Sequence, residues 1–273
     1  MNYRHAFHAG NHADVLKHAV LLYCLEWLQR KPAPFAVLET HAGRGLYDLK
    51  GDEASRSPEW RDGVGRLWDW PDPPALVARY LDAVRGFNAD GTLRTYPGSP
   101  ALSVTRLRDD DALLACELHP EDHAALRRAL PRKSNVHVHA RDGWQALNAL
   151  LPPPQRRGLV LIDPPYEAPD ELARAACALG QSLKRFGYGV YLWWRPLKSE
   201  GALNAADAVT RAQGAKETLR ADLWVAQPTP DGRLVGSSVF LINPPLGLRE
   251  AHAEALPFLV DALSKGQSGW RLT

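Results

Sequence analysis

Short apolar runs alternate with amphipathic helical patterns through the middle of this 273-residue chain. The runs with the character of buried strands cover residues 35–40, 113–117, 136–140, 159–162 and 189–194. Helical patterns lie between them, at residues 121–129, 143–150 and 169–185. Strands that alternate with helices favour a parallel sheet that is covered on both faces. We therefore predict an α/β fold.

The two ends of the chain depart from this alternation. Residues 11–28 have apolar side chains at helical spacing and predict a helix ahead of the first strand. Near the C-terminus, the runs at 222–226 and 238–242 flank a Pro-Asp-Gly turn region, which is typical of a β-hairpin. The last strands of the sheet are therefore expected to be antiparallel.

Residues 49–96 interrupt the alternation with two helix signatures. One begins at Ser57, as the N-cap before Pro58, and the other covers residues 74–87. We interpret this segment as a small helical insertion subdomain. The core is then formed by residues 1–48 together with 97–273.

Composition restricts the class of protein without selecting one. Hydrophobic residues make up 45% and charged residues 23% of the chain, and no apolar stretch is long enough to span a bilayer. The three cysteines, Cys24, Cys116 and Cys177, are too few and too widely spaced to indicate a disulfide framework or a four-thiolate zinc site. We expect a cytoplasmic protein that does not contact a membrane.

The net charge of +2 is too small to indicate a strongly basic nucleic-acid-binding protein. Any surface for nucleic acid has to be local. The candidate basic clusters are Arg127, Arg128, Arg132 and Lys133, then Arg156 with Arg157, and Lys184 with Arg185. For each cluster, a solvated helix end or loop is the favoured interpretation.

A glycine-containing loop, residues 41–45, follows the first strand and includes Gly43 and Gly45. Glycines let the backbone approach a ligand closely, as in nucleotide-binding turns. The dinucleotide fingerprint needs a third glycine three positions after the second, where this chain has Asp48. The loop therefore favours a ligand without a pyrophosphate, such as S-adenosylmethionine. A plain tight turn stays open as the alternative.

Three further positions suit such a ligand. Glu117 ends the second apolar strand, where a carboxylate can accept hydrogen bonds from ribose hydroxyls, and the insertion explains its long distance from the loop. Asp142 follows the third strand and could accept from an adenine amino group, act as a helix N-cap, or do both. Ser99 is expected to be an N-cap before Pro100, at a helix terminus that could attract a carboxylate.

The run Asp163-Pro164-Pro165-Tyr166 follows a buried strand. Its position is the carboxyl edge of the predicted sheet, where ligands bind in open α/β sheets. The Asp163 carboxylate and the Pro164 carbonyl can accept from the two hydrogens of a planar amine such as adenine N6, and Tyr166 offers a flat face for the base. We predict that these three residues are catalytic. The alternative is a rigid strand exit without catalytic function.

The chain resembles, over essentially its whole length, the ribosomal RNA large subunit methyltransferase J family, which forms N6-methyladenine in 23S rRNA. The likeness is carried by residues 3–18, Thr40-His41-Ala42-Gly43, Pro97-Gly98-Ser99-Pro100 and residues 162–167. It implies a Rossmann-like class I methyltransferase fold with a mostly parallel sheet, an antiparallel C-terminal hairpin strand and a small helical insertion.

The resemblance also implies ligand contacts and a target, adenine 2030 in the usual numbering of 23S rRNA. Tyr3 would contact the RNA, and Asp163 would be the catalytic acceptor. Arg44 stands where the family pattern suggests a small residue. The predicted contacts of S-adenosylmethionine, with Gly43 of the glycine loop included, are Lys17, His18, His41, Gly43, Ser99, Glu117, Asp142, Gly143 and Asp163.

A cluster of histidines in the first 18 residues suggests zinc on spacing alone. Zinc sites commonly include a cysteine or a carboxylate, and Asp14 is the only acid nearby, so we expect no metal and a histidine-rich wall of the cofactor pocket. We expect a monomer that binds 23S rRNA. Two alternatives are a DNA adenine methyltransferase, which uses the same four-residue run, and a catalytically idle RNA-binding protein.

Overall fold

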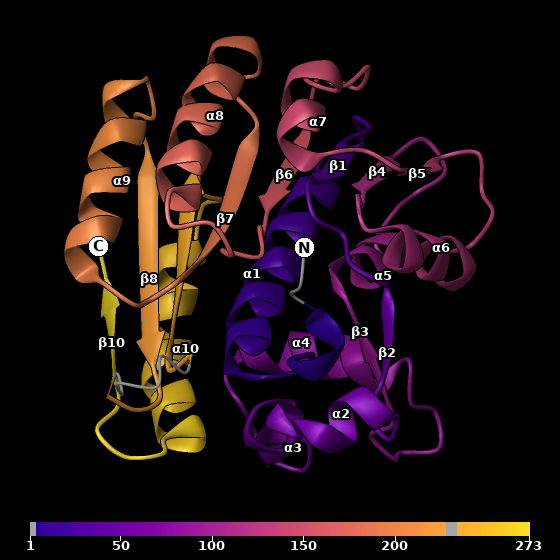
Figure 1. Ribbon diagram of the computed structural model, residues 1–273, viewed down its shortest axis with the longest axis vertical. Coiled ribbons are helices and arrows are strands. Elements are labelled where there is room, and N and C mark those ends of the chain that lie inside the picture. The colour runs from indigo at the N-terminus through magenta and orange to yellow at the C-terminus, as the bar shows by residue number, and fades with distance from the viewer. Residues whose placement is uncertain (1–3, 228–233) are drawn as a thin grey trace.

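The fold was obtained as a computed structural model that describes residues 4–227 and 234–273. Eight strands form one mixed sheet in the order β10-β8-β9-β7-β6-β1-β4-β5 (Figure 1). The strands are β1 (Ala36–Glu39), β4 (Ala112–Cys116), β5 (Val136–His139), β6 (Gly158–Ile162), β7 (Val190–Pro196), β8 (Thr218–Trp224), β9 (Gly236–Ile242) and β10 (Gly269–Leu272).

The strand directions confirm the predicted fold class. β1 is parallel to both β4 and β6, β4 is parallel to β5, and β6 is parallel to β7. β9 is antiparallel to β7 and to β8, as expected for a C-terminal hairpin, and β10 adds an antiparallel edge beside β8. The Pro-Asp-Gly turn predicted between β8 and β9 lies outside the described residues. β10 was not predicted, because this four-residue strand is only partly buried.

The strand order reverses at β1. The chain runs from β1 to β4 on one side and returns to β6 on the other side. The carboxyl ends of these three strands therefore open at a topological switch point, which is where α/β sheets bind ligands.

Helices cover both faces of the sheet. One core packs α1 (His12–Gln29), α4 (Ala75–Arg85) and α10 (Leu248–Leu263) against side chains such as Val37. The other packs α7 (Gly143–Ala149), α8 (Glu171–Arg185) and α9 (Glu200–Ala212) against side chains such as Leu38. Neighbouring residues of β1 point to opposite faces, so both sides of the strand are buried. Figure 1 shows α7, α8 and α9 side by side.

Helix α1 brings polar residues into an otherwise apolar core. It begins where Asn11 Oδ1 accepts the N–H groups of Ala13 at 2.9 Å and Asp14 at 3.1 Å, a typical N-cap. Asp14, Lys17 and His18 follow at spacings of three and four residues, so they share one helix face. All three are buried. No helix in the described ranges is long and apolar enough to cross a membrane.

The segment predicted as an insertion is helical, with its base closed by a two-stranded sheet. Its elements are β2 (Leu46–Asp48), α2 (Asp52–Arg56), the short 3₁₀ helix η2 (Glu59–Asp62), α3 (Val64–Leu67), α4 and β3 (Thr95–Pro97). α4 packs against α1 within the shared core. Whether residues 49–96 are a subdomain of their own remains a prediction.

Two N-cap predictions were wrong. Ser57 is the residue that ends α2, and the next helix, η2, begins after Pro58. A helix, α2, already begins at Asp52, ahead of the position that the Ser-Pro pair predicted. Asp52 and Glu53 give it an acidic first turn, which suits a helix N-terminus. Helix α5 (Ser99–Val104) has Gly98 as its N-cap, because the Ser99 hydroxyl is used in a different contact.

Candidate active site

A cavity of about 1120 Å³ lies at the carboxyl ends of β1, β4 and β6. Eleven residues of the sequence prediction line it, from six helices and loops that are far apart in the chain. They are Lys17, His18, His41, Gly43, Ser99, Glu117, Asp142, Gly143, Asp163, Pro164 and Tyr166. Tyr3, which we predicted to contact RNA, lies outside the described residues.

Glu117 closes the glycine loop from the neighbouring strand. Its Oε2 accepts the Gly43 N–H at 2.8 Å, and its Oε1 accepts the His119 N–H at 2.8 Å. Gly43 has a φ of 65°, in the left-handed region that glycine adopts without strain. Burial raises the pKa of Glu117, although the two N–H groups oppose this shift. Each carboxylate oxygen keeps a lone pair that can accept a ribose hydroxyl.

Asp142 is the N-cap of α7, which is one of the two roles considered for it. Its Oδ1 accepts the N–H of Trp144 at 2.8 Å and that of Gln145 at 3.1 Å. Gly143 then passes against β1 so closely that a Cβ atom would lie 2.3 Å from the Thr40 carbonyl oxygen. Glycine is required there because any larger residue would push α7 away from the cavity wall.

Glu39, which the sequence analysis did not predict, lies behind the cavity wall and contacts Ser99. It is the last residue of β1 and is fully buried, and it accepts the Ser99 hydroxyl at 2.6 Å and the Ser103 hydroxyl at 2.8 Å. Burial raises its pKa to about 7, with the two hydroxyl groups opposing the shift. The signal in the sequence was an acid at the end of an apolar strand, directly before the glycine loop.

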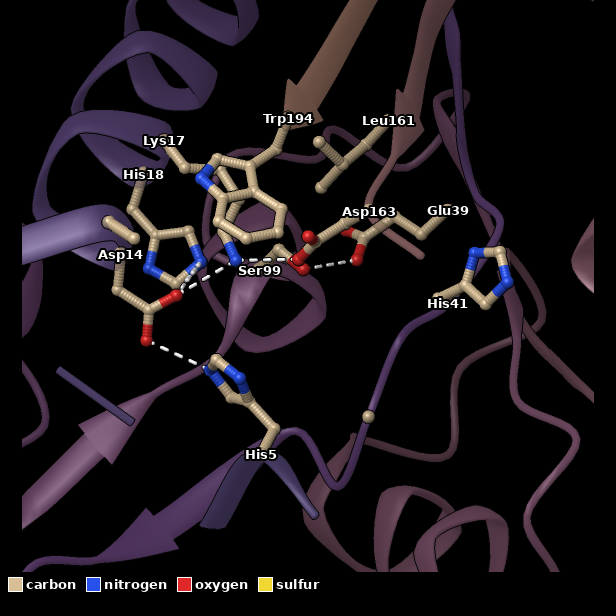
Figure 2. A network of polar contacts seen from close by, with 12 residues as sticks. His5, Asp14, Lys17, His18, Glu39, His41, Ser99, Leu161, Asp163 and Trp194 are labelled. Carbon is tan, nitrogen blue, oxygen red and sulfur yellow. Dashed lines mark hydrogen bonds and ion pairs between the residues drawn. The ribbon is translucent and has the colours of Figure 1, made fainter. Parts of the chain in front are cut away.

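Lys17 links the N-terminal helix to the catalytic run. Its Nζ lies 2.6 Å from Asp163 Oδ2 and 2.8 Å from Asp14 Oδ1, beneath the Trp194 ring (Figure 2). Burial alone would lower the Lys17 pKa, but the carboxylates of Asp14 and Asp163 raise it above its usual value. Lys17 is therefore a fixed cation that holds one oxygen of Asp163.

Three of the N-terminal histidines are paired with protein groups, whereas the buried His12 Nε2 has no hydrogen-bond partner among the described residues. His5 Nε2 lies 2.9 Å from Asp14 Oδ2, His8 Nδ1 lies 2.9 Å from Glu59 Oε1, and His18 Nδ1 lies 2.9 Å from the Tyr96 hydroxyl. Figure 2 shows His5 and His18 on either side of Asp14. The part of the chain that the structure describes contains no group of three or more His, Cys, Asp or Glu side chains placed to hold a metal ion.

Tyr166 completes the catalytic run in an unusual backbone conformation. Its φ is 53°, in the left-handed region, and its hydroxyl donates to the Trp194 carbonyl at 2.8 Å. The same hydroxyl accepts the Trp193 indole N–H at 2.8 Å. Tyr166 lines the same cavity as Asp163 and Pro164.

The residues of the cavity fit S-adenosylmethionine. The ligand is cationic at its sulfonium, and burial lowers the pKa of His18 to about 3 and of His41 to about 4, so both rings are neutral at pH 7. Glu117 offers acceptors for a ribose, and Gly143 lines the same cavity where α7 packs closely against the end of β1. With the Rossmann-like sheet, the short glycine loop and the Asp-Pro-Pro-Tyr run after β6, the site defines a class I S-adenosylmethionine-dependent methyltransferase.

Comparisons with known proteins narrow this class. The family model "RsmJ: Ribosomal RNA large subunit methyltransferase D, RlmJ" matches residues 32–273. The chain is 39% identical to ribosomal RNA large subunit methyltransferase J of Escherichia coli (strain K12) over 98% of this chain and 96% of that one. It is 40% identical to the protein of that name from Haemophilus influenzae, over 99% and 97% of the two chains. The chain belongs to the ribosomal RNA large subunit methyltransferase J family.

A solved structure shares the fold over nearly the whole chain. The crystal structure of a Legionella pneumophila protein superposes with a TM-score of 0.88 at 34% identity, over 97% of this chain and 98% of that one. The family resemblance inferred from the sequence motifs is confirmed by these matches.

Proposed function

We propose that this protein transfers a methyl group from S-adenosylmethionine to N6 of an adenine in 23S rRNA. The observation that carries the proposal is the Lys17–Asp163 pair, which lies beside Pro164 and Tyr166 in the same cavity as Glu117 and Gly143. The two relatives with about 40% identity are named for activity on large-subunit rRNA, which supports the substrate.

Asp163 and Pro164 would hold the target amine. Adenine N6 is a weak nucleophile because its lone pair is delocalised into the ring, and two acceptors aimed at its hydrogens favour the pyramidal, more nucleophilic form. Lys17 occupies Oδ2 of Asp163, which leaves Oδ1 for one N6 hydrogen, while the Pro164 carbonyl takes the other. The ring of Tyr166 would stack on the base, which contributes about 1–3 kcal/mol.

S-adenosylmethionine supplies an electrophilic methyl group on sulfur. With that group transferred to N6 and the thioether leaving with the cofactor, Asp163 would accept the extra proton of the methylated nitrogen and pass it to water. Asp163 does not have to be a strong base, because this proton is acidic only after the transfer. The site residues mainly provide proximity and orientation.

We infer specific roles for the residues around the cofactor. Glu117 would accept from the ribose, and Asp142 with Gly143 would face the adenine. Lys17, His18, His41, Gly43 and Ser99 would line the rest of its pocket. That no metal takes part, and that the enzyme acts as a cytoplasmic monomer, stay predictions.

Three basic residues at the cavity support an RNA substrate. Arg56 at the end of α2, Arg174 on α8 and Lys198 after β7 line the cavity and are exposed. Within residues 4–227 and 234–273, none of the three side chains has an ion-pair partner. Exposed cations without an ion pair around a site for a flipped base are suited to hold the phosphates on either side of it.

A comparison of two substrates, rRNA and DNA, tests the proposal. Purified protein and labelled cofactor are incubated with 23S rRNA lacking modifications and, separately, with duplex DNA that contains adenine. We expect methyl incorporation into the rRNA at the adenine implied by the family, and none into DNA. Incorporation into DNA alone would replace this proposal with the DNA methyltransferase, and failure to bind the cofactor in calorimetry would favour an idle RNA-binding protein.

A further inference from the structure

The hydroxyl of Tyr166 is fully engaged inside the protein. It has one proton to donate and gives it to the Trp194 carbonyl at 2.8 Å, while it accepts the Trp193 indole N–H at 2.8 Å. Burial raises the pKa of the Tyr166 phenol well above its usual value, so it stays protonated and keeps both bonds. The hydroxyl therefore has no proton left to donate to a substrate, whereas Tyr166 still lines the cavity.

Trp193 makes this contact from outside the cavity. It is fully buried in β7, directly opposite Ile162, which is the last residue before the catalytic run. Trp193 is absent from the cavity wall, whereas Tyr166 and Trp194 are part of it. The Trp193 indole thus reaches the site only through the Tyr166 hydroxyl.

The Trp193 ring is itself held in place on its far side. The guanidinium of Arg195 lies 4.8 Å from the centroid of the Trp193 ring and 4.8 Å from that of the Phe240 ring. Arg195 is fully buried, and it pairs with Asp207 of α9 and donates to Ser238 Oγ at 3.0 Å. A side chain packed between charged and aromatic neighbours has little freedom to rotate, so its N–H points in a fixed direction.

We propose that Trp193 is a positioning residue that fixes the orientation of the Tyr166 ring for stacking on the target base. The left-handed backbone of Tyr166 is a conformation that bulky residues rarely adopt, so the loop needs an external anchor to hold it. Trp193 provides that anchor at the tip of the side chain. This inference rests on the proposed function, because it assigns the ring of Tyr166 to the adenine.

The test is a double-mutant cycle with Trp193→Phe, Tyr166→Phe and the double variant. Each change removes one partner of the hydrogen bond and keeps an aromatic ring. Trp68→Phe is the matched control, because the Trp68 indole N–H donates to the Gly91 carbonyl at 3.1 Å and Trp68 does not line the cavity. Turnover and KM are measured on unmodified 23S rRNA, and cofactor affinity is measured by calorimetry.

We expect Trp193→Phe to reduce kcat/KM for rRNA by about tenfold, as for loss of a buried hydrogen bond, and to leave cofactor affinity within about twofold. Tyr166→Phe removes this hydrogen bond and also the one to the Trp194 carbonyl, so it should reduce kcat/KM at least as much. The double variant should be no worse than Tyr166→Phe alone, because Tyr166→Phe has already broken the contact that Trp193→Phe removes. Trp68→Phe should behave like the wild type. A loss of kcat/KM in the double variant equal to the product of the two single losses, about a hundredfold or more, would overturn the proposal. So would a parallel loss of cofactor binding and activity in Trp193→Phe.

A measurement without turnover separates this inference from the proposed function. In protein labelled at the tryptophan indole nitrogens, the resonance that disappears in Trp193→Phe belongs to Trp193. We expect that resonance to shift in Tyr166→Phe and to stay in place in Trp68→Phe. An unmoved resonance would contradict the anchor even if the wild type methylates rRNA. If the resonance shifts in Tyr166→Phe but the wild type methylates no RNA, the anchor stands and the proposed function is contradicted.

Discussion

Lys17 is a cation enclosed by protein, with only 4% of its side chain exposed, between the carboxylates of Asp14 and Asp163. Replacing one member of a buried ion pair leaves the other charge without compensation. The pair is therefore expected to contribute to stability as well as to the geometry of Asp163.

We predict that Lys17→Met lowers the free energy of unfolding by about 3–5 kcal/mol, since the buried Asp14 carboxylate loses its lysine partner and the partly buried Asp163 loses its ion pair. Urea unfolding monitored by circular dichroism measures the change. Lys265→Met is the control, because Lys265 pairs with Asp62 at 2.6 Å while both side chains are about 40% exposed. That exposed pair is expected to contribute no more than about 1 kcal/mol. Equal losses in the two variants would show that burial of the Lys17 pair does not matter.

At the scale of residues, the sequence predicted which side chains lie in the site better than it predicted which of them contact one another. Asp163, Glu117 and Asp142 could be placed because each follows an apolar run that ends at the ligand edge of the sheet. The contacts of Lys17 with Asp163 and of Ser99 with Glu39 join residues 146 and 60 positions apart. No local pattern encodes such pairs, because they depend on how the helices pack on the sheet.

At the scale of elements, the start of α7 is the tightest point of the site. The Gly143 Cα lies against the end of β1, where a Cβ would meet both the Thr40 carbonyl oxygen at 2.3 Å and a carbon of the His41 ring at 2.9 Å. Backbone cannot move aside as a flexible side chain can, so a larger residue has to displace the helix.

We predict that Gly143→Ala destabilises the protein by about 1–3 kcal/mol, as overpacking does, and weakens cofactor binding. Thermal unfolding and calorimetry give the two values. The matched control is Gly201→Ala in α9, where the nearest atom to an added Cβ is Ser199 Oγ at 4.0 Å. That change should raise stability by about 0.5–1 kcal/mol, because alanine favours the helix. Unchanged cofactor affinity in Gly143→Ala would contradict the role given to this helix start.

Elements with a strong apolar pattern were predicted and those with a weak one were not. β1, β4 and β6 are buried on both faces, so their sequences are continuous apolar runs. β10 is a partly exposed edge strand, and β2 with β3 are three-residue strands whose pairing depends on the insertion between them. Short strands of this kind carry too few residues for a periodic signal.

At the scale of the whole molecule, buried histidines couple stability to pH. Burial lowers the pKa of His12, His41 and His252 to about 4, and of His18 to about 3. The unfolded chain therefore binds more protons than the folded one between these values and 6.5, so stability falls as the pH drops through that range. Glu39 acts in the opposite direction, because its raised pKa favours the folded state at low pH and loses that effect between 4.5 and about 7.

His252→Phe tests this balance away from the active site. His252 is fully buried in α10, and its Nε2 has no hydrogen-bond partner among the described residues. We predict that the slope of unfolding free energy against pH between about 5 and 6 falls by close to one proton, or about 1.4 kcal/mol per pH unit. Urea unfolding at several pH values measures the slope. An unchanged slope would mean that His252 is not held neutral by folding.

The cations at the cavity mouth are expected to govern RNA affinity as a group. Replacing Arg56, Arg174 and Lys198 with Gln should weaken rRNA binding and reduce the slope of log affinity against log salt by about 2, since each phosphate contact contributes about 0.7–0.9. Cofactor affinity should not change. The control replaces the exposed Arg127, Arg128 and Arg132, which do not line the cavity. An equal loss of rRNA affinity and salt dependence in the control variant would contradict a special role for the three cations at the cavity.

The most direct measurement of the central claim is the identity of the methylated nucleoside. Unmodified 23S rRNA is incubated with labelled S-adenosylmethionine and either wild-type protein or Asp163→Asn, then digested to nucleosides and separated by chromatography. We predict label in N6-methyladenosine with the wild type, and turnover at least about a hundredfold lower with Asp163→Asn, which keeps its cofactor affinity. Label in any other nucleoside, or near-normal turnover by Asp163→Asn, would contradict the account.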